Sequence, residues 1–331
     1  MERFALAAAV VLGFALTAAL CSLFVPLRRV LERREQQQQP VQSEQPRPAP
    51  LRAPLWGGLC AAAGTVAAVG VGWLAACVGQ PELLGSESRL MTRLLTALAG
   101  SLAFGTVGFA EDLARMRSPA ALGLRRDVRL LLEALAAAFV LLLLRAAGCL
   151  PRGLGVPGAG YVLLGSAVPF LWAVLMVALA ECARIAERDE GAVCGAAFVA
   201  MLALMMVEAG LGVSGLAVLP GALAGALVAL GLWAFPPARL GVGCCGSLLA
   251  AGAIGCIPLS LDMTSLTVPL ALPFWAAGGL LAAQLLCAKR TGKPLRCWVK
   301  KHKMSPETVF LCSFALSAVG YVLALALLRW C

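Results

Sequence analysis

Long apolar runs, separated by short breaks that carry charged residues, glycine or proline, dominate this chain. Each run extends over about 15–24 residues, close to the ~20 that an α-helix needs to cross the hydrocarbon of a bilayer. Hydrophobic residues make up 61% of the chain and charged residues 13%, whereas about a quarter of an ordinary soluble domain is charged. The pattern predicts an all-α polytopic membrane protein of about ten transmembrane helices. The expected spans are 4–25, 55–78, 94–110, 130–149, 161–180, 192–208, 211–234, 247–261, 267–288 and 308–330.

Positive charge is distributed unevenly among the breaks between these runs. Of the 27 Lys and Arg residues, 21 fall in every second break. Positive loops remain on the cytoplasmic side of a membrane, so both termini are predicted to be extracytoplasmic. Topology and contact with anionic membrane lipids then explain the net charge of +10, and no nucleic-acid partner is expected. The loops predicted to be cytoplasmic are 28–53, 111–129, 181–191, 236–246 and 289–307.

The first of these loops differs from the rest of the chain in composition. Residues 35–50 read EQQQQPVQSEQPRPAP, with many Gln and Pro residues and almost no apolar side chains. Such a segment cannot bury enough apolar surface to fold, so the loop 28–53 is expected to hold a disordered insertion. Residues 1–331 are otherwise expected to form a single transmembrane domain.

The 13 cysteines do not follow a metal-binding spacing. Several lie inside apolar runs, no CxxC pair occurs, and His302 is the only histidine. These cysteines are interpreted as small buried hydrophobic residues, and the sequence predicts neither a zinc nor an iron–sulfur site.

A charged stretch after the third run is the first candidate for chemistry. Residues 105–129 read GTVGFAEDLARMRSPAALGLRRDVR, with two adjacent carboxylates followed by several arginines. Paired acids with nearby cations at a membrane surface suit Mg²⁺ and a phosphate. The alternative is a solvated loop whose arginines only fix topology. Ion-coupled transport is less favoured, because only Glu133 and Glu208 approach the middle of the membrane.

The stretch 105–129 resembles the GFxDDxxK…GLxxxxK motif of the polyprenyl-phosphate phosphosugar transferases, of the glycosyltransferase family 4 type. Residues 54–58 (PLWGG) resemble the PTMGG opening of that family, and residues 237–248 (PARLGVGCCGSL) resemble PAKxFMGDTGSL. Residues 181–195 fall where the family has NAVNLTDGLDGLAAG, and residues 292–307 fall where it has GKR and a His-rich loop. The resemblance covers nearly the whole chain.

This resemblance implies a multi-pass enzyme of the bacterial cell membrane. The enzyme would move a phospho-N-acetylhexosamine, phospho-N-acetylmuramoyl-pentapeptide being one candidate, from a UDP-linked amino sugar to undecaprenyl phosphate in cell-wall or surface-glycan synthesis. Mg²⁺ is the implied cofactor, with Mn²⁺ as the alternative, and a homodimer is expected. The implied catalytic residues are Glu111, Asp112, Glu187 and Glu190; the substrate-binding and phosphate-binding residues are Arg115, Arg129, Arg239 and His302; the metal positions are Asp112, Glu187 and Cys244.

Several motif positions that carry functional residues in the family hold other residues in this chain. Cys244 replaces the aspartate of GDTGSL, and a thiol is a poor ligand for the hard Mg²⁺ ion. Glu181 and Arg184 replace two asparagines, and Arg188 replaces a glycine. The consecutive histidines are reduced to His302.

Two readings of these replacements remain open. In the first, the chain is a transferase whose metal site is re-formed from Asp112, Glu187 and Glu190. In the second, the chain is a catalytically impaired family member that binds lipid phosphate or a cell-wall partner without turnover. The replaced acids other than that at Cys244 remain acidic, which favours retained binding of an ion or a phosphate.

Overall fold

The computed structural model describes most of the chain, including all ten expected spans in whole or in large part. The described residues are 2–38, 56–79, 88–117, 123–151, 153–156, 160–163, 165–187, 190–213, 215–235, 238–291 and 306–330.

The prediction of an all-α polytopic membrane protein is confirmed. Each expected span overlaps one long α-helix, because a backbone in hydrocarbon must satisfy its own hydrogen bonds. In chain order these helices are α1 (Glu2–Gln38), α2 (Gly57–Gly79), α4 (Ser88–Arg117), α5 (Arg126–Ala146), α6 (Ala167–Ala186), α7 (Glu190–Gly210), α8 (Val218–Ala234), α9 (Gly243–Ser260), α11 (Leu272–Thr291) and α13 (Pro306–Trp330). The 3-10 turn η1 (Thr264–Leu266) and the short helix α10 (Thr267–Leu270) connect α9 to α11.

Within the described residues, seven helices are long and apolar enough to cross a membrane, namely α1, α2, α4, α6, α7, α9 and α13. Helix α8 is equally apolar but has 17 residues. Helix α5 has 21 residues and carries five charged side chains, which lower its hydropathy. One of these charged residues, Arg129, lies within ion-pair distance of Glu111 on α4 and of Glu181 on α6.

Several boundaries differ from the sequence predictions; α8, for example, begins at Val218 rather than at 211. Helix α4 continues to Arg117, so the acids expected in a loop at 111–129 lie on its last turns. Helix α1 continues to Gln38, so the loop expected from residue 28 begins later, and residues 39–53 lie outside the described part. The span expected at 161–180 begins at Ala167, because the residues before it form an antiparallel hairpin.

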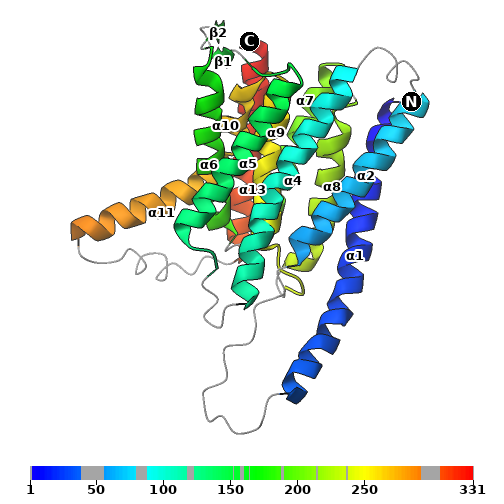
Figure 1. Cartoon of the computed structure of the whole chain (residues 1–331), viewed down its shortest axis with the longest axis vertical. Helices are drawn as coiled ribbons and strands as arrows, with labels where there is room; N and C mark the ends of the chain where they lie inside the picture. The colour runs from blue at the N-terminus through cyan, green and yellow to red at the C-terminus, as the bar shows by residue number, and fades with distance from the viewer. Residues whose placement is uncertain are drawn as a thin grey trace.

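This hairpin pairs β1 (Gly153–Val156) with β2 (Gly160–Leu163), with Gly153 opposite Leu163. The Tyr161 hydroxyl donates to the Asp262 carboxylate at 3.0 and 3.2 Å, which links the hairpin to the turn after α9. The start of α1 and the end of α13 lie at the same end of the bundle as the hairpin (Figure 1). Which end faces the cytoplasm remains a prediction from the positive charges.

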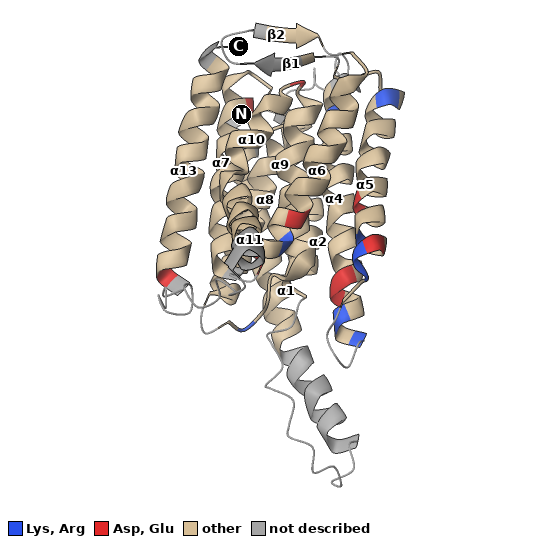
Figure 2. Ribbon diagram, turned by 90° about the vertical axis from the view of Figure 1, so that its left-hand side faces the viewer, with Lys and Arg blue, Asp and Glu red and all other residues tan. Residues whose placement is uncertain are grey.

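The bundle is built around α9. The whole apolar window of α9 is buried, and its most extensive packing is against α4. Helix α11 instead projects sideways from the bundle (Figure 1). Charged residues gather on α4 and α5 at the end opposite the hairpin, as Figure 2 shows. We call this the charged end of the bundle.

Candidate active site

One arginine is shared by three carboxylates at the charged end. Glu111 and Asp112 are adjacent on α4, and Arg115 follows them by about one helical turn, where residues i and i+4 are neighbours. Arg115 donates from Nη2 to Glu111 Oε1 at 2.8 Å and from Nη1 to Glu187 Oε1 at 3.0 Å. Its Nη1 is also 3.9 Å from Asp112 Oδ1. All three acids are buried, so Arg115 faces three carboxylates in a site with little access to water.

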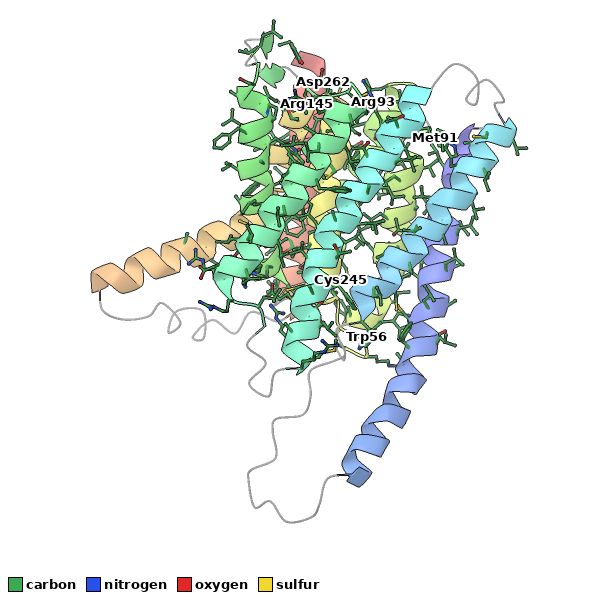
Figure 3. The ribbon with its side chains drawn as sticks, viewed as in Figure 1. Trp56, Met91, Arg93, Arg145, Cys245 and Asp262 are labelled. Carbon is green, nitrogen blue, oxygen red and sulfur yellow. The ribbon has the colours of Figure 1, made fainter. Side chains whose placement is uncertain are left out.

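Asp112 ties this centre to the first turn of α9. Its Oδ1 accepts the backbone N–H of Cys244 at 3.0 Å, and its Oδ2 accepts that of Cys245 at 2.9 Å. A helix N-terminus offers unpaired N–H groups and favours negative charge, which suits a carboxylate here. The Cys244 thiol donates to Glu187 Oε2 at 2.8 Å. Figure 3 shows the labelled Cys245 towards the charged end, far from Asp262.

Glycines allow the backbones to meet at this point. A Cβ on Gly108 of α4 would collide with the Cys244 carbonyl, and a Cβ on Gly58 of α2 would collide with the backbone at Gly246. The N–H of Gly58 donates to the Val242 carbonyl at 3.0 Å. Three of the motif stretches, 54–58, 105–129 and 237–248, therefore converge on the start of α9.

A second charged group lies beside the first. Arg129 of α5 donates from Nε to Glu181 Oε1 at 2.7 Å, and Arg184 of α6 donates from Nη2 to Glu181 Oε2 at 2.7 Å. Arg129 Nη1 also lies 3.7 Å from Glu111 Oε1, which joins the two groups. We call Glu111, Asp112, Arg115, Glu187 and Cys244 the acid-rich group. We call Arg129, Glu181 and Arg184 the arginine-rich group.

Several buried polar atoms in these two groups, or close beside them, have no hydrogen-bond partner among the described residues. They include Glu111 Oε2, Arg184 Nε and both carboxylate oxygens of Glu133, which follows Arg129 by one turn on α5. A buried polar atom without a partner is costly, so such atoms mark positions where a ligand would complete the site. Both groups therefore have unused capacity to bind.

The structure brings together six of the predicted site residues, namely Glu111, Asp112, Arg115, Arg129, Glu187 and Cys244. Glu190 is the first residue of α7, and its side chain lies outside the described part, as does the whole of His302. Arg239 is exposed and, among the described residues, forms no recorded ion pair with these acids. The partners Glu181 and Arg184 were absent from the predicted set, although their i, i+3 spacing on a helix was the available signal.

Arg239 lines a separate cavity of about 860 Å³. Most of its walls are apolar side chains and glycines of α7, α8 and α13, including Phe198, Leu227, Phe310 and Phe314. Phe310 contacts Phe235 edge to face at 5.5 Å between ring centroids. The cavity thus offers an apolar surface with one cation at its rim, apart from the two charged groups.

The donor atoms of the predicted metal position do not match Mg²⁺. One ligand atom from each of Asp112, Glu187 and Cys244 lies within 4.8 Å of the others. Mg²⁺ demands near-octahedral coordination by oxygen, and one of these three donors is sulfur. Both Asp112 oxygens already accept backbone N–H groups, so any cation bound here would share these oxygens with those donors. The expected Mg²⁺ cofactor therefore remains a prediction that this donor set does not favour.

Comparisons with known proteins agree with the motif resemblance. A family model described as Glycosyl transferase family 4 matches residues 94–262, about half of the chain and the stretch that holds both charged groups. The phospho-N-acetylmuramoyl-pentapeptide-transferase of Desulforudis audaxviator (strain MP104C) is 32% identical over 170 residues, which cover 48% of this chain and 50% of that relative. The enzyme of the same name from Geobacillus kaustophilus (strain HTA426) is 25% identical over 309 residues, 92% of this chain and 89% of that relative.

Proposed function

The chain belongs to glycosyl transferase family 4, and from this premise we propose that it is a membrane phosphosugar transferase of bacterial cell-wall synthesis. Its proposed donor is a UDP-linked amino sugar, and its proposed acceptor is undecaprenyl phosphate. Two relatives with the name phospho-N-acetylmuramoyl-pentapeptide-transferase support this choice, one of them along most of the chain. The apolar helices support a location in the bacterial plasma membrane. A homodimer is proposed from the family alone.

One observation carries this proposal: an acid-rich and an arginine-rich group lie side by side at one end of an apolar bundle. They are joined by the 3.7 Å approach of Arg129 to Glu111. The residues of both groups lie between positions 94 and 262, the stretch that the family model matches. Cations that neutralise phosphate charge in a water-poor site are what phosphoryl transfer requires.

In the proposed reaction, an oxygen of the lipid phosphate attacks the phosphorus that carries the sugar. The bond from that phosphorus to the bridging oxygen breaks, and UMP leaves with the electron pair. Arg129 and Arg184 are placed to donate hydrogen bonds to phosphate oxygens, because both already donate charge-assisted hydrogen bonds to one carboxylate. Arg184 Nε, which has no partner among the described residues, would gain one from the phosphate. The apolar surroundings exclude water that would otherwise compete as the nucleophile.

The second candidate function is binding of lipid phosphate without turnover. The observation in its favour is that Arg115, Arg129 and Arg184 each have a carboxylate partner already, so a substrate must displace an internal acid. The thiol of Cys244, in place of the family aspartate, also favours this candidate.

Release of UMP by the purified protein in lipid nanodiscs separates the two candidates. The substrates are undecaprenyl phosphate and UDP-N-acetylmuramoyl-pentapeptide, tested with Mg²⁺ and with Mn²⁺. Under the transferase proposal, wild type releases UMP and Arg129→Gln slows release by about 100-fold, from the loss of one charge-assisted contact worth ~1.5–3 kcal/mol. The matched control is Arg125→Gln, whose ion pair with Asp127 is exposed. A folded wild type that binds the lipid phosphate but releases no UMP would favour the second candidate.

A further inference from the structure

The acid-rich group has the composition of a site for a different kind of metal ion. We propose that Asp112, Glu187 and Cys244 bind a thiophilic divalent cation of the Zn²⁺ class in preference to Mg²⁺. The proposal concerns the centre to which the proposed function assigns transfer, but metal binding is measured separately from turnover. The sequence alone did not predict a zinc site, because these three residues come from three distant segments without a CxxC spacing.

The separations between the donor atoms of the three residues support the proposal. Ligand atoms around one tetrahedral Zn²⁺ ion lie roughly 3.5 Å apart, given bond lengths of ~2.0–2.3 Å. In the structure, the donor atoms of the three residues lie within 4.8 Å of one another, and Cys244 Sγ lies 2.8 Å from Glu187 Oε2. To place one ion among them, the 2.8 Å distance from Cys244 Sγ to Glu187 Oε2 must lengthen and any wider separations must shorten. Three protein ligands leave the fourth position open, as in catalytic rather than structural zinc sites.

Charge balance points in the same direction. Within the acid-rich group, three buried carboxylates face the single guanidinium of Arg115. Arg129 lies 3.7 Å from Glu111 but is shared with Glu181, so the acid-rich group keeps an excess of negative charge, which a divalent ion would reduce. Buried charges of one sign are costly unless they are paired or coordinate a metal.

An independent observation is the Glu111 side chain. It is 2% exposed, and its Oε2 has no hydrogen-bond partner among the described residues. Its Oε1 accepts from the same guanidinium that binds Glu187, so the carboxyl lies inside the centre. An unpartnered carboxylate oxygen at this place is suited to orient a water on the open position of the ion.

The sulfur atom decides which ion is preferred. Zn²⁺ binds thiolate well, whereas Mg²⁺ selects carboxylate, carbonyl and water oxygens. When the zinc–sulfur bond forms, the Cys244 S–H bond breaks and the proton leaves to solvent. The affinity for Zn²⁺ therefore rises with pH. The hydrogen bond from Cys244 to Glu187 is replaced by two bonds to the same ion.

Co²⁺ is a coloured substitute for Zn²⁺ and tests the proposal directly. Purified full-length protein in nanodiscs is titrated with Co²⁺, and the thiolate-to-cobalt absorption is followed while Zn²⁺ or excess Mg²⁺ is added. Wild type should show this absorption and lose it to Zn²⁺ but not to Mg²⁺. Cys244→Ser should lose the absorption and bind Zn²⁺ at least about 10-fold more weakly. Cys244→Asp should gain competition by Mg²⁺, because a carboxylate restores an all-oxygen donor set.

Controls separate this site from the other cysteines. Cys312→Ser changes an exposed thiol on α13 and should leave the cobalt spectrum unchanged. Thermal unfolding establishes that each variant is folded. The proposal is overturned if Cys244→Ser keeps the full absorption, if folded wild type binds no Co²⁺, or if Mg²⁺ displaces Co²⁺ as well as Zn²⁺ does. Zinc binding without UMP release would leave this proposal standing and remove the transferase proposal.

Discussion

The acid-rich and arginine-rich groups are neighbours with opposite charge ratios. The first has three carboxylates for one guanidinium, and the second has two guanidiniums for the single carboxylate of Glu181. The first therefore has capacity for a cation and the second for an anion. The closeness of Arg129 to Glu111 keeps the two groups in electrostatic contact. The comparison teaches that two neighbouring charged groups in one bundle can carry an excess of opposite charge while remaining in contact.

The largest predicted effect comes from removing the only cation of the acid-rich group. Arg115→Met removes the guanidinium that Glu111, Asp112 and Glu187 share and leaves Glu111 with only the more distant Arg129, and breaking such a buried pair costs about 3–5 kcal/mol. Chemical unfolding of the purified protein measures this loss. The matched control is Arg125→Met, whose ion pair is exposed and contributes less than about 1 kcal/mol. Equal losses in the two variants would show that the shared arginine does not stabilise this group.

A smaller effect is expected where Asp112 receives two backbone donors. Asp112→Asn keeps one acceptor oxygen but turns an NH₂ group towards the N–H of Cys244 or Cys245, at a cost of about 1–3 kcal/mol. The free energy of unfolding is compared with that of Asp127→Asn, an exposed acid at the start of α5. If both variants unfold alike, Asp112 does not hold the start of α9 in place.

The arginine-rich group should control the affinity for lipid phosphate in both directions. Arg184→Gln is expected to weaken binding of undecaprenyl phosphate about 10-fold, equivalent to ~1.4 kcal/mol. Glu181→Gln should strengthen it several-fold, because both arginines lose a competing carboxylate. Binding is measured in nanodiscs against undecaprenol, the uncharged alcohol. Equal affinity for the alcohol and the phosphate would show that these arginines do not read the phosphate.

The smallest effect is expected at Glu133. Glu133 is buried, and neither of its oxygens has a hydrogen-bond donor among the described residues, so Glu133→Gln removes no such contact and should not lower the free energy of unfolding. Unfolding of this variant is compared with that of Glu181→Gln. A similar loss of unfolding free energy in both variants would show that Glu133 helps to stabilise the arginine-rich group, as Glu181 does.

The helices could be predicted from sequence because hydrocarbon imposes one length and one composition on each span. The ends could not. Helix α4 continues beyond its apolar run because Glu111, Asp112 and Arg115 find partners on other helices, which hydropathy cannot reveal. The hairpin at residues 153–163 was missed because its strands have four residues each and are rich in glycine, which is atypical of strands.

The candidate site was predicted in part. The motif order identified Asp112, Glu187 and Cys244, and the structure brings their donor atoms together. The pairing of Arg129 with Glu181 depends on how α5 and α6 pack side by side, and no spacing along one helix encodes that contact. The sequence indicated that Cys244 is a weak Mg²⁺ ligand, but only the structure shows the thiol bonded to Glu187.

Burial of α9 has a consequence for how the protein is made. All of its apolar window is covered by other helices, and glycines let α2 and α4 approach its backbone closely. In the folded protein, the surface of this helix is therefore surrounded by protein rather than by lipid. A nascent chain that ends before Gly243 would already contain every charged residue of both groups, yet Asp112 would have no N–H groups to accept from α9. The hydrogen bonds that complete the centre at Asp112 therefore cannot form until α9 has been synthesised.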